Sequence, residues 1–257
     1  MVIPDMVEPS AASAVAFVLV VVVVAAMIVG GAAAAGPRLG EAPATTRRRA
    51  VAWSLGVAAW LGLTAWASGS GALEAPGLPP RAMLFMAGCN LFALALALSP
   101  AGARFARGLP VWALVGFHGF RLPLELVLHR WYVEGVLPPQ MTYVGRNLDI
   151  ITGALGLGLG LLLWRWRGGP RPIIRACALA FNLIGLALLI NVAAIAVLSA
   201  PFPFRVFMNE PAVLLVFHVP YGWIVPMCVA PALAGHVVLF RWLRVEGARA
   251  EHGARAS

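Results

Sequence analysis

Seven long apolar segments, separated by short polar loops, make up most of the chain. They cover residues 12–36, 50–68, 82–99, 109–131, 148–165, 173–199 and 212–240. The apolar core of a bilayer needs about 20 apolar residues per helix, so each segment predicts one transmembrane helix. The pattern therefore predicts an all-α polytopic membrane protein, a seven-transmembrane-helix bundle.

The arginines beside these segments predict the orientation of the chain. Short cytoplasmic loops carry the excess of positive residues in membrane proteins. Seven spans place fourteen of the 19 arginines on one side, after the first, third, fifth and seventh segments. We therefore expect the N-terminus outside and the C-terminus inside. These arginines are Arg38, Arg47, Arg48, Arg49, Arg104, Arg107, Arg165, Arg167, Arg171, Arg175, Arg241, Arg244, Arg249 and Arg255.

The domain organisation follows from the scarcity of long polar stretches. Residues 1–243 are predicted to form a single transmembrane helical domain, and residues 244–257 a disordered cytoplasmic tail. The first apolar segment resembles a signal peptide in the small residues at its end. Its leader has no positive residue, and the segment exceeds the apolar part of a signal, about 7–15 residues, so we interpret it as a span.

Composition supports this class and excludes several functions. The chain is 61% hydrophobic and 11% charged, against about 25% charged residues in soluble domains. It has no lysine, which excludes Schiff-base chemistry and favours a GC-rich bacterial genome. We therefore expect a multi-pass protein of the bacterial inner membrane. The net charge of +9 is explained by the loop arginines, so no nucleic-acid partner is predicted.

Residues 109–131 carry the densest set of ionisable side chains within a span. His118, Arg121, Glu125 and His129 are spaced by three, four and four residues, which places them on one helical face. Arg121 and Glu125 can neutralise each other at this spacing, and Pro123 between them predicts a kink. Ionisable residues inside a span mark functional sites by default, although a purely structural ion pair is the alternative.

The segment after this helix, residues 132–147, is too polar to span and contains Pro138 and Pro139. We expect a short interfacial or re-entrant segment on the outer face. It would deliver Arg146, Asn147 and Asp149 to the start of the next helix. The sequence thus predicts one outward-facing polar site for a ligand or a proton, with His118 deeper; alternatively, Asp149 only complements the helix dipole. The site residues are His118, Arg121, Glu125, Arg146, Asn147 and Asp149.

The later spans add packing and cofactor hypotheses. Gly156 and Gly160 form a GxxxG pattern, which is typical of close helix packing in lipid. Three prolines predict an irregular last helix. His118 and His236 lie at depths that would allow one b-type haem between them, whereas the sequence shows no other metal site. Buried histidines bonded to a neighbour are the competing interpretation.

Several motifs form a recognisable set: HGFRLPLELVL, PPQMTYVGRNLDIITG and NVAAIAVLSAPFPFRVF, followed by the proline-broken helix that ends at His236. With this set, residues 115–243 resemble a family of uncharacterised bacterial integral membrane proteins. The resemblance implies where a site lies and transfers no activity. It marks His118, Arg121, Glu125, Arg146, Asn147 and Asp149, which are also the residues that spacing singles out.

The sequence is compatible with three functions. The leading hypothesis is binding or transport of a small solute, with an anionic group for an arginine and Glu125 or Asp149 as the proton carrier. A second is a non-catalytic subunit of a larger membrane complex. A third is an intramembrane redox or lipid and quinone enzyme with a b-type haem. The sequence leaves open whether the protein is an enzyme.

Overall fold

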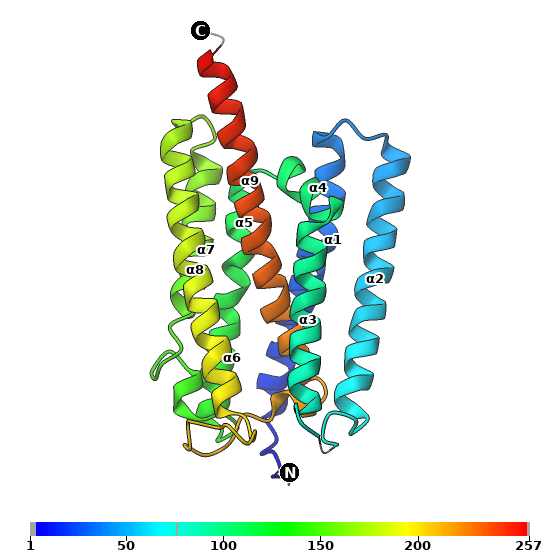
Figure 1. Ribbon diagram of the computed structural model, residues 1–257, viewed down its shortest axis with the longest axis vertical. Coiled ribbons are helices and arrows are strands. Elements are labelled where there is room, and N and C mark those ends of the chain that lie inside the picture. Colours follow the sequence, from blue (N-terminus) through cyan, green and yellow to red (C-terminus); the bar gives the residue numbers. More distant parts are fainter. Residues whose placement is uncertain (1–3, 76, 256–257) are drawn as a thin grey trace.

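The computed structural model describes residues 4–75 and 77–255, and the side chains of these residues up to 248. They form a long bundle of helices that run side by side and alternate in direction, with the two termini at opposite ends (Figure 1). The long helices are α1 (Ala11–Arg38), α2 (Pro43–Gly69), α3 (Arg81–Leu98), α8 (Arg171–Ser199) and α9 (Ala230–Arg255). The shorter ones are α4 (Pro100–Gly108), α5 (Val111–Phe117), α6 (Arg121–Val133) and α7 (Ile150–Arg165).

Six helical segments of the described chain are long and apolar enough to cross a membrane. They are α1, α2, α3, Val111–Val133, α8 and Tyr221–Ala248. Helix α7 is apolar but has only 16 residues. The structure therefore confirms a helical, multi-pass membrane protein. The first six predicted spans agree with helices of the structure to within two residues at each end, except that α2 begins at Pro43, seven residues before the predicted start.

Local sequence explains where these helices start and break. Prolines open α2 and α4, where the missing backbone N–H costs nothing because that group has no partner inside the helix. The span Val111–Val133 contains a 3₁₀ turn, η1 (His118–Phe120), between α5 and α6. Pro123 causes this irregularity, since it lacks an N–H and its ring clashes with the carbonyl four residues earlier. The α-helix is thus interrupted just before the residue at which the sequence predicts a kink.

The last predicted span, residues 212–240, differs from the structure at both ends. Residues 212–220 contain only the 3₁₀ turn η3 (Leu215–Phe217), and helical structure resumes in η4 (Tyr221–Trp223) and the π-helical turn η5 (Ile224–Val229). The three prolines explain this irregular start. Helix α9 then continues to Arg255, so the prediction of a disordered tail over 244–257 is wrong as far as residue 255. Alanine, arginine and glutamate favour helix there; residues 256 and 257 lie outside the described residues.

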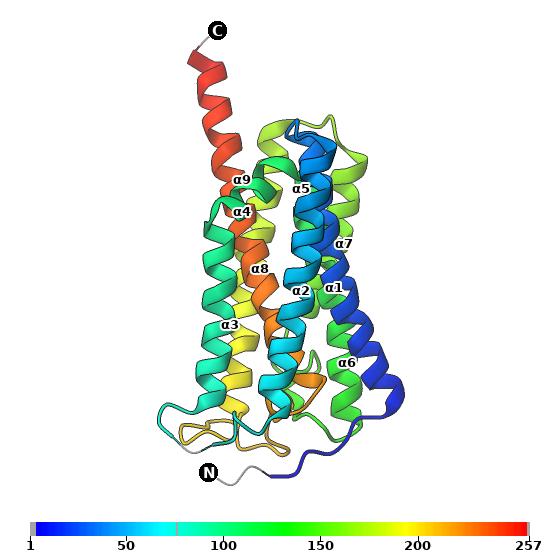
Figure 2. The same cartoon turned by 90° about the vertical axis from the view of Figure 1, so that its right-hand side faces the viewer.

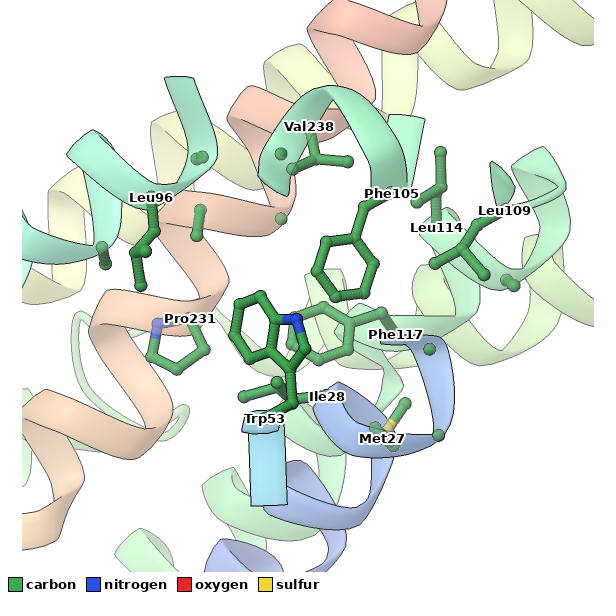
Figure 3. A pocket seen from close by; sticks show the side chains of 18 of the residues that line it. Met27, Ile28, Trp53, Leu96, Phe105, Leu109, Leu114, Phe117, Pro231 and Val238 are labelled. Atoms are coloured by element: carbon green, nitrogen blue, oxygen red, sulfur yellow. The ribbon is translucent and has the colours of Figure 1, made fainter. Parts of the chain in front are cut away.

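The helices pack as two groups around α9. Helices α5 and α6 lie against α7, which also contacts α8, while α2 packs on α1 at the opposite edge of the bundle (Figures 1 and 2). The predicted glycine contacts are confirmed, because a Cβ on Gly160 would lie 2.8 Å from the Gly116 Cα. A cavity of about 1190 Å³ is lined by residues of α1, α2, α3, α5 and α9 (Figure 3).

Candidate functional site

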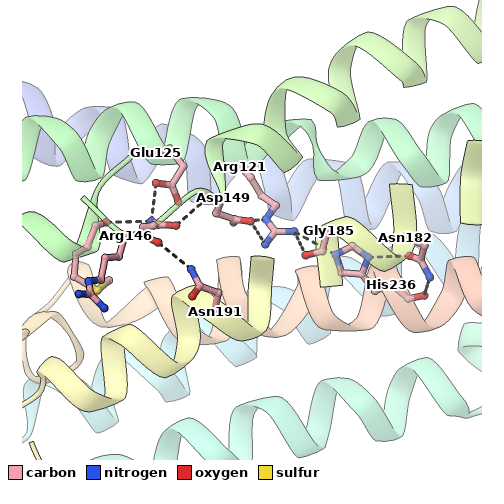
Figure 4. Close-up of polar contacts among 10 residues, drawn as sticks. Arg121, Glu125, Arg146, Asp149, Asn182, Gly185, Asn191 and His236 are labelled. Carbon is pink, nitrogen blue, oxygen red and sulfur yellow. Dashed lines mark hydrogen bonds and ion pairs between the residues drawn. The ribbon is translucent and has the colours of Figure 1, made fainter. Parts of the chain in front are cut away.

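A buried ion pair between Arg121 and Asp149 forms the centre of the candidate site. Arg121 is the first residue of α6, and Asp149 immediately precedes α7. The guanidinium meets both carboxylate oxygens, Nε to Oδ2 and Nη2 to Oδ1, and the two residues are 1% and 3% exposed (Figure 4). This two-pronged geometry is the one with which arginine recognises planar anions.

The remaining amino group of Arg121 connects the ion pair to α8 and α9. Its Nη1 donates to the Gly185 carbonyl at 3.3 Å and lies 3.2 Å from His236 Nε2. A guanidinium only donates, so Nε2 of His236 accepts and its Nδ1 carries the proton. That Nδ1 donates to the Asn182 side-chain oxygen at 2.8 Å, and the Asn182 amide donates back to the His236 carbonyl at 3.2 Å. Asn182 thus connects α8 to α9.

Glu125 is the second carboxylate of the site. It lies one helical turn after Arg121, but it accepts its hydrogen bond from Asn147 Nδ2, at 2.7 Å. The same Nδ2 donates to the Met141 carbonyl at 3.0 Å, while the Asn147 oxygen accepts from the Asp149 N–H at 3.1 Å. Asn147 therefore connects the Glu125 carboxylate to the backbone of Asp149.

The non-helical segment before α7 positions Asn147 and Asp149. It follows η2 (Pro139–Met141), and Thr142, Asn147 and Asp149 within it are all at most 3% exposed. Gly145 is required for this path, because a Cβ there would meet the Pro139 carbonyl oxygen at 2.2 Å. The segment thus enters the bundle, as predicted for a re-entrant segment, and brings its polar groups to Glu125.

The site lies near mid-length on three of the apolar segments. Arg121 is one residue from the middle of Val111–Val133, and Gly185 is the middle residue of α8. His236 lies within two residues of the middle of Tyr221–Ala248. At the centre of a membrane, an ionised side chain costs about 2.5–3.5 kcal/mol on insertion scales. The site therefore holds ionised side chains at the depth where their free-energy cost in a membrane is highest.

His118 stacks against His236 next to this network. The ring centroids are 4.1 Å apart, with 32° between the planes, and neither ring nitrogen of His118 has a hydrogen-bond partner. A haem held by both histidines needs its macrocycle between the rings. Two rings in van der Waals contact leave no such space, so the residues do not fit a haem. Among the described residues, no group of three His, Cys, Asp or Glu side chains is arranged to hold a metal ion.

The structure brings together five of the six predicted site residues: His118, Arg121, Glu125, Asn147 and Asp149. Arg146 is separate, because its side chain is exposed and lies over the Phe207 ring at 5.4 Å. Its backbone carbonyl accepts a hydrogen bond from Asn191 Nδ2 at 2.9 Å. Arg146 is the last residue of a turn, residues 143–146, and its side chain points outward while that of Asn147 after it is buried.

Two further expectations differ from the observed geometry. Arg121 pairs with Asp149 rather than with Glu125, since the non-helical segment brings in a carboxylate that helical spacing does not reveal. The site is also closed rather than outward-facing, because its side chains are at most 3% exposed. Sequence reasoning missed Asn182 and Gly185 as site residues; their only signal was an amide and a glycine within one apolar helix.

The charges within the site do not balance when both carboxylates are ionised. One guanidinium faces Asp149 and Glu125, and His236 is neutral because Nε2 accepts from Arg121. Burial of an unpaired charge is strongly unfavourable. One proton bound to a carboxylate makes the three side chains Arg121, Asp149 and Glu125 neutral together. The site is therefore able to gain or lose a proton when a charged group enters or leaves it.

Comparisons with known proteins add no assignment: no family model, no curated protein and no solved structure matches this chain.

Proposed function

We propose that the chain crosses the bacterial inner membrane seven times, with its N-terminus outside, and that α7 is one of the crossings. Helix α7 packs along α5, η1 and α6 and against α8, and its 16 residues span about 24 Å at 1.5 Å per residue. The preceding segment 142–149 adds to this length, and its side chains Thr142, Asn147 and Asp149 are buried although Arg146 is exposed. Non-helical backbone at membrane depth is tolerated where protein covers it, and these three buried residues are covered.

We propose further that the site binds and transports a small solute with an anionic group. The supporting observation is the closed, two-pronged contact of Arg121 with Asp149 at mid-length of the bundle. A carboxylate or phosphate of the solute would make the same contact with the guanidinium. In this proposal, Asp149 holds the place of the solute in the empty state and leaves Arg121 when the solute arrives.

Glu125 is the proton carrier in this proposal. When an anion replaces Asp149 at Arg121, the released Asp149 carboxylate takes the proton that Glu125 holds in the empty state. Glu125 then takes up one proton from solution, so the group stays neutral. Glu125 is hydrogen bonded to Asn147, two residues before Asp149, so movement of the segment changes the surroundings of Glu125 directly. His118, whose ring nitrogens are unpartnered, is the next titratable side chain toward the other end of the bundle.

Thermal unfolding with and without added anions tests the binding step. Phosphate, sulfate, lactate, succinate and glutamate serve as probes, and the nine tryptophans report unfolding. An anion at 100 times its Kd stabilises the protein by about 2.7 kcal/mol. We expect at least one probe to raise Tm in the wild type, and the double variant Arg121→Met, Asp149→Leu to lose this response.

The matched control is the ion pair between Arg205 and Glu210, which is 3.1 Å long and has Glu210 72% exposed. Its double variant Arg205→Met, Glu210→Leu should respond to the anion as the wild type does. If no probe stabilises the wild type, or if the Arg121 and Asp149 variant keeps the response, the anion site is elsewhere or absent.

A further inference from the structure

The cavity of about 1190 Å³ lies between α1, α2, α3, α5 and α9, away from the polar network (Figure 3). Its walls are apolar side chains and small residues, including Ile28, Trp53, Phe105, Phe117 and Val238. Pockets for small ligands usually measure about 300–1,000 Å³ and contain a few convergent polar groups. This cavity is larger and lacks such groups along its length, so it favours hydrocarbon over a polar solute.

The cavity opens sideways to the surroundings of the bundle. Leu63 of α2, Phe92 of α3 and Leu161 of α7 line it, yet they are 56%, 46% and 65% exposed. Helix α2 buries little of its own surface in the bundle, which leaves the cavity without a complete wall on that side. Within a bilayer, the opening faces lipid chains, so a lipid reaches the cavity from the membrane itself.

A basic pocket adjoins one end of the cavity. This second pocket, of about 510 Å³, shares Ala52 and Trp53 with the cavity. Its charged lining residues are Arg49, Arg104, Arg107 and Glu41. Arg38, which lines the cavity, lies at the same end of α1.

Glu41 neutralises only part of this charge. It accepts hydrogen bonds from Arg104 at 2.7 and 2.8 Å and is paired with Arg49. The hydrogen bond and the charge of Arg104 lower the pKa of Glu41, so this carboxylate is ionised at neutral pH. Arg107 is exposed and has no ion-pair partner among the described residues. Two guanidinium charges therefore remain in excess at the mouth of the cavity.

We propose that the cavity and its basic pocket hold one anionic phospholipid from the leaflet at the arginine-rich end of the bundle. Its acyl chains occupy the apolar cavity, and its phosphate lies at Arg49 and Arg107. Guanidinium groups bind phosphate oxygens in pairs, and the excess positive charge selects an anionic over a zwitterionic headgroup. This inference does not rest on the anion site at Arg121.

The experiment counts lipids on the purified protein by native mass spectrometry. The full chain is exchanged into mixed micelles of phosphatidylglycerol and phosphatidylcholine with the same acyl chains. The wild type should retain one phosphatidylglycerol in preference to phosphatidylcholine. The double variant Arg49→Gln, Arg107→Gln leaves the Arg104 and Glu41 pair intact and should bind phosphatidylglycerol roughly 30-fold more weakly.

Two matched controls separate this site from general effects of charge and packing. The double variant Arg171→Gln, Arg244→Gln removes the same charge from exposed arginines outside both pockets and should retain the lipid. A Cβ on Gly56 or on Gly62, both in α2, meets no atom within 4 Å, but only Gly56 lines the cavity. We therefore expect Gly56→Leu to expel the lipid and Gly62→Leu to keep it.

Three results would overturn the proposal. The first is equal retention of the two lipids by the wild type. The second is unchanged retention in Gly56→Leu, since the chains would then lie elsewhere. The third is loss of the lipid in an excess of inorganic phosphate, because the basic pocket would then be a site for free anions rather than for a lipid headgroup.

Discussion

Arg121 is the residue around which the polar network is arranged, and Asp149 is its charge partner. Removing one member of a buried ion pair costs about 3–5 kcal/mol, whereas replacing both members by apolar residues of similar size is often neutral. We expect Asp149→Leu to lower the free energy of unfolding by that amount, and Arg121→Met with Asp149→Leu to recover most of it. Equilibrium unfolding in detergent measures the free energy of unfolding of both variants. If the double variant lost as much of it as the single variant does, the ion pair would mainly stabilise the fold.

Glu134 is a carboxylate outside the spans that gives a pH-dependent contribution to stability. Partial burial raises its pKa, but hydrogen bonds from Ser10 and Ser13, together with Arg130, outweigh this and lower the pKa to about 2. A lowered pKa stabilises the fold above the unfolded value, about 4.3, and the contribution is lost as pH falls toward 2.

We therefore expect Glu134→Gln to be less stable than the wild type by about 1–2 kcal/mol at pH 7. The two proteins should converge as pH falls through 2 and below, because Glu134 then becomes protonated in the folded state as well as in the unfolded state. Thermal unfolding across this range measures the difference, with Glu210→Gln as an exposed control that should change little. A deficit that is the same at pH 2 and pH 7 would contradict the assignment.

Sequence spacing predicted which residues form the buried site better than it predicted which of them contact each other. His118, Arg121 and Glu125 share a helical face, and the structure places all three in one buried cluster. The partner of Arg121 was not predictable, because Asp149 arrives through a non-helical segment whose path depends on tertiary contacts. Nor did spacing reveal that the Arg146 side chain points away from the site that Asn147 and Asp149 enter.

Helix α7 depends on glycine contacts with α5, η1 and α6. A Cβ on Gly153 would lie 2.2 Å from the Leu122 backbone nitrogen, and neither backbone is able to move freely. We expect Gly153→Ala to destabilise the protein by about 1–3 kcal/mol through overpacking. Gly158, on the same helix, has no atom within 4 Å of an added Cβ.

Gly158→Ala is therefore the matched control, and its better helix propensity should stabilise the protein by up to about 1 kcal/mol. Thermal unfolding of the two variants compares them directly. If Gly153→Ala proved as stable as Gly158→Ala, α7 would not approach α6 as closely as the structure shows.

At the level of elements, hydrophobic runs predicted the helices but not all of their ends. The first six spans were predictable because uninterrupted apolar runs of this length have few alternatives. Residues 212–220 are also apolar, but they form no continuous helix, since Pro220 removes a backbone donor and its ring clashes with the carbonyl four residues earlier. Apolarity alone does not distinguish a buried irregular segment from a helix.

For the whole molecule, the proposed seven crossings place residues 135 and 168 on opposite sides of the membrane. We expect alkaline phosphatase inserted after Gly135 to be active, because that loop lies outside, and the same enzyme inserted after Gly168 to be inactive. Activity measurements in intact bacterial cells distinguish the two positions. Equal activity at both would mean that α7 does not cross the membrane.

Proton movement driven by an anion, followed in sealed proteoliposomes with a trapped pH-sensitive dye, tests the proposed transport most directly. We predict that an external anion that stabilises the wild type also drives proton entry faster than in protein-free vesicles. Glu125→Gln should fall to the rate of those vesicles, while Glu210→Gln should retain the wild-type rate. Wild-type rates in Glu125→Gln, or no anion-dependent proton entry at all, would contradict the proposed function.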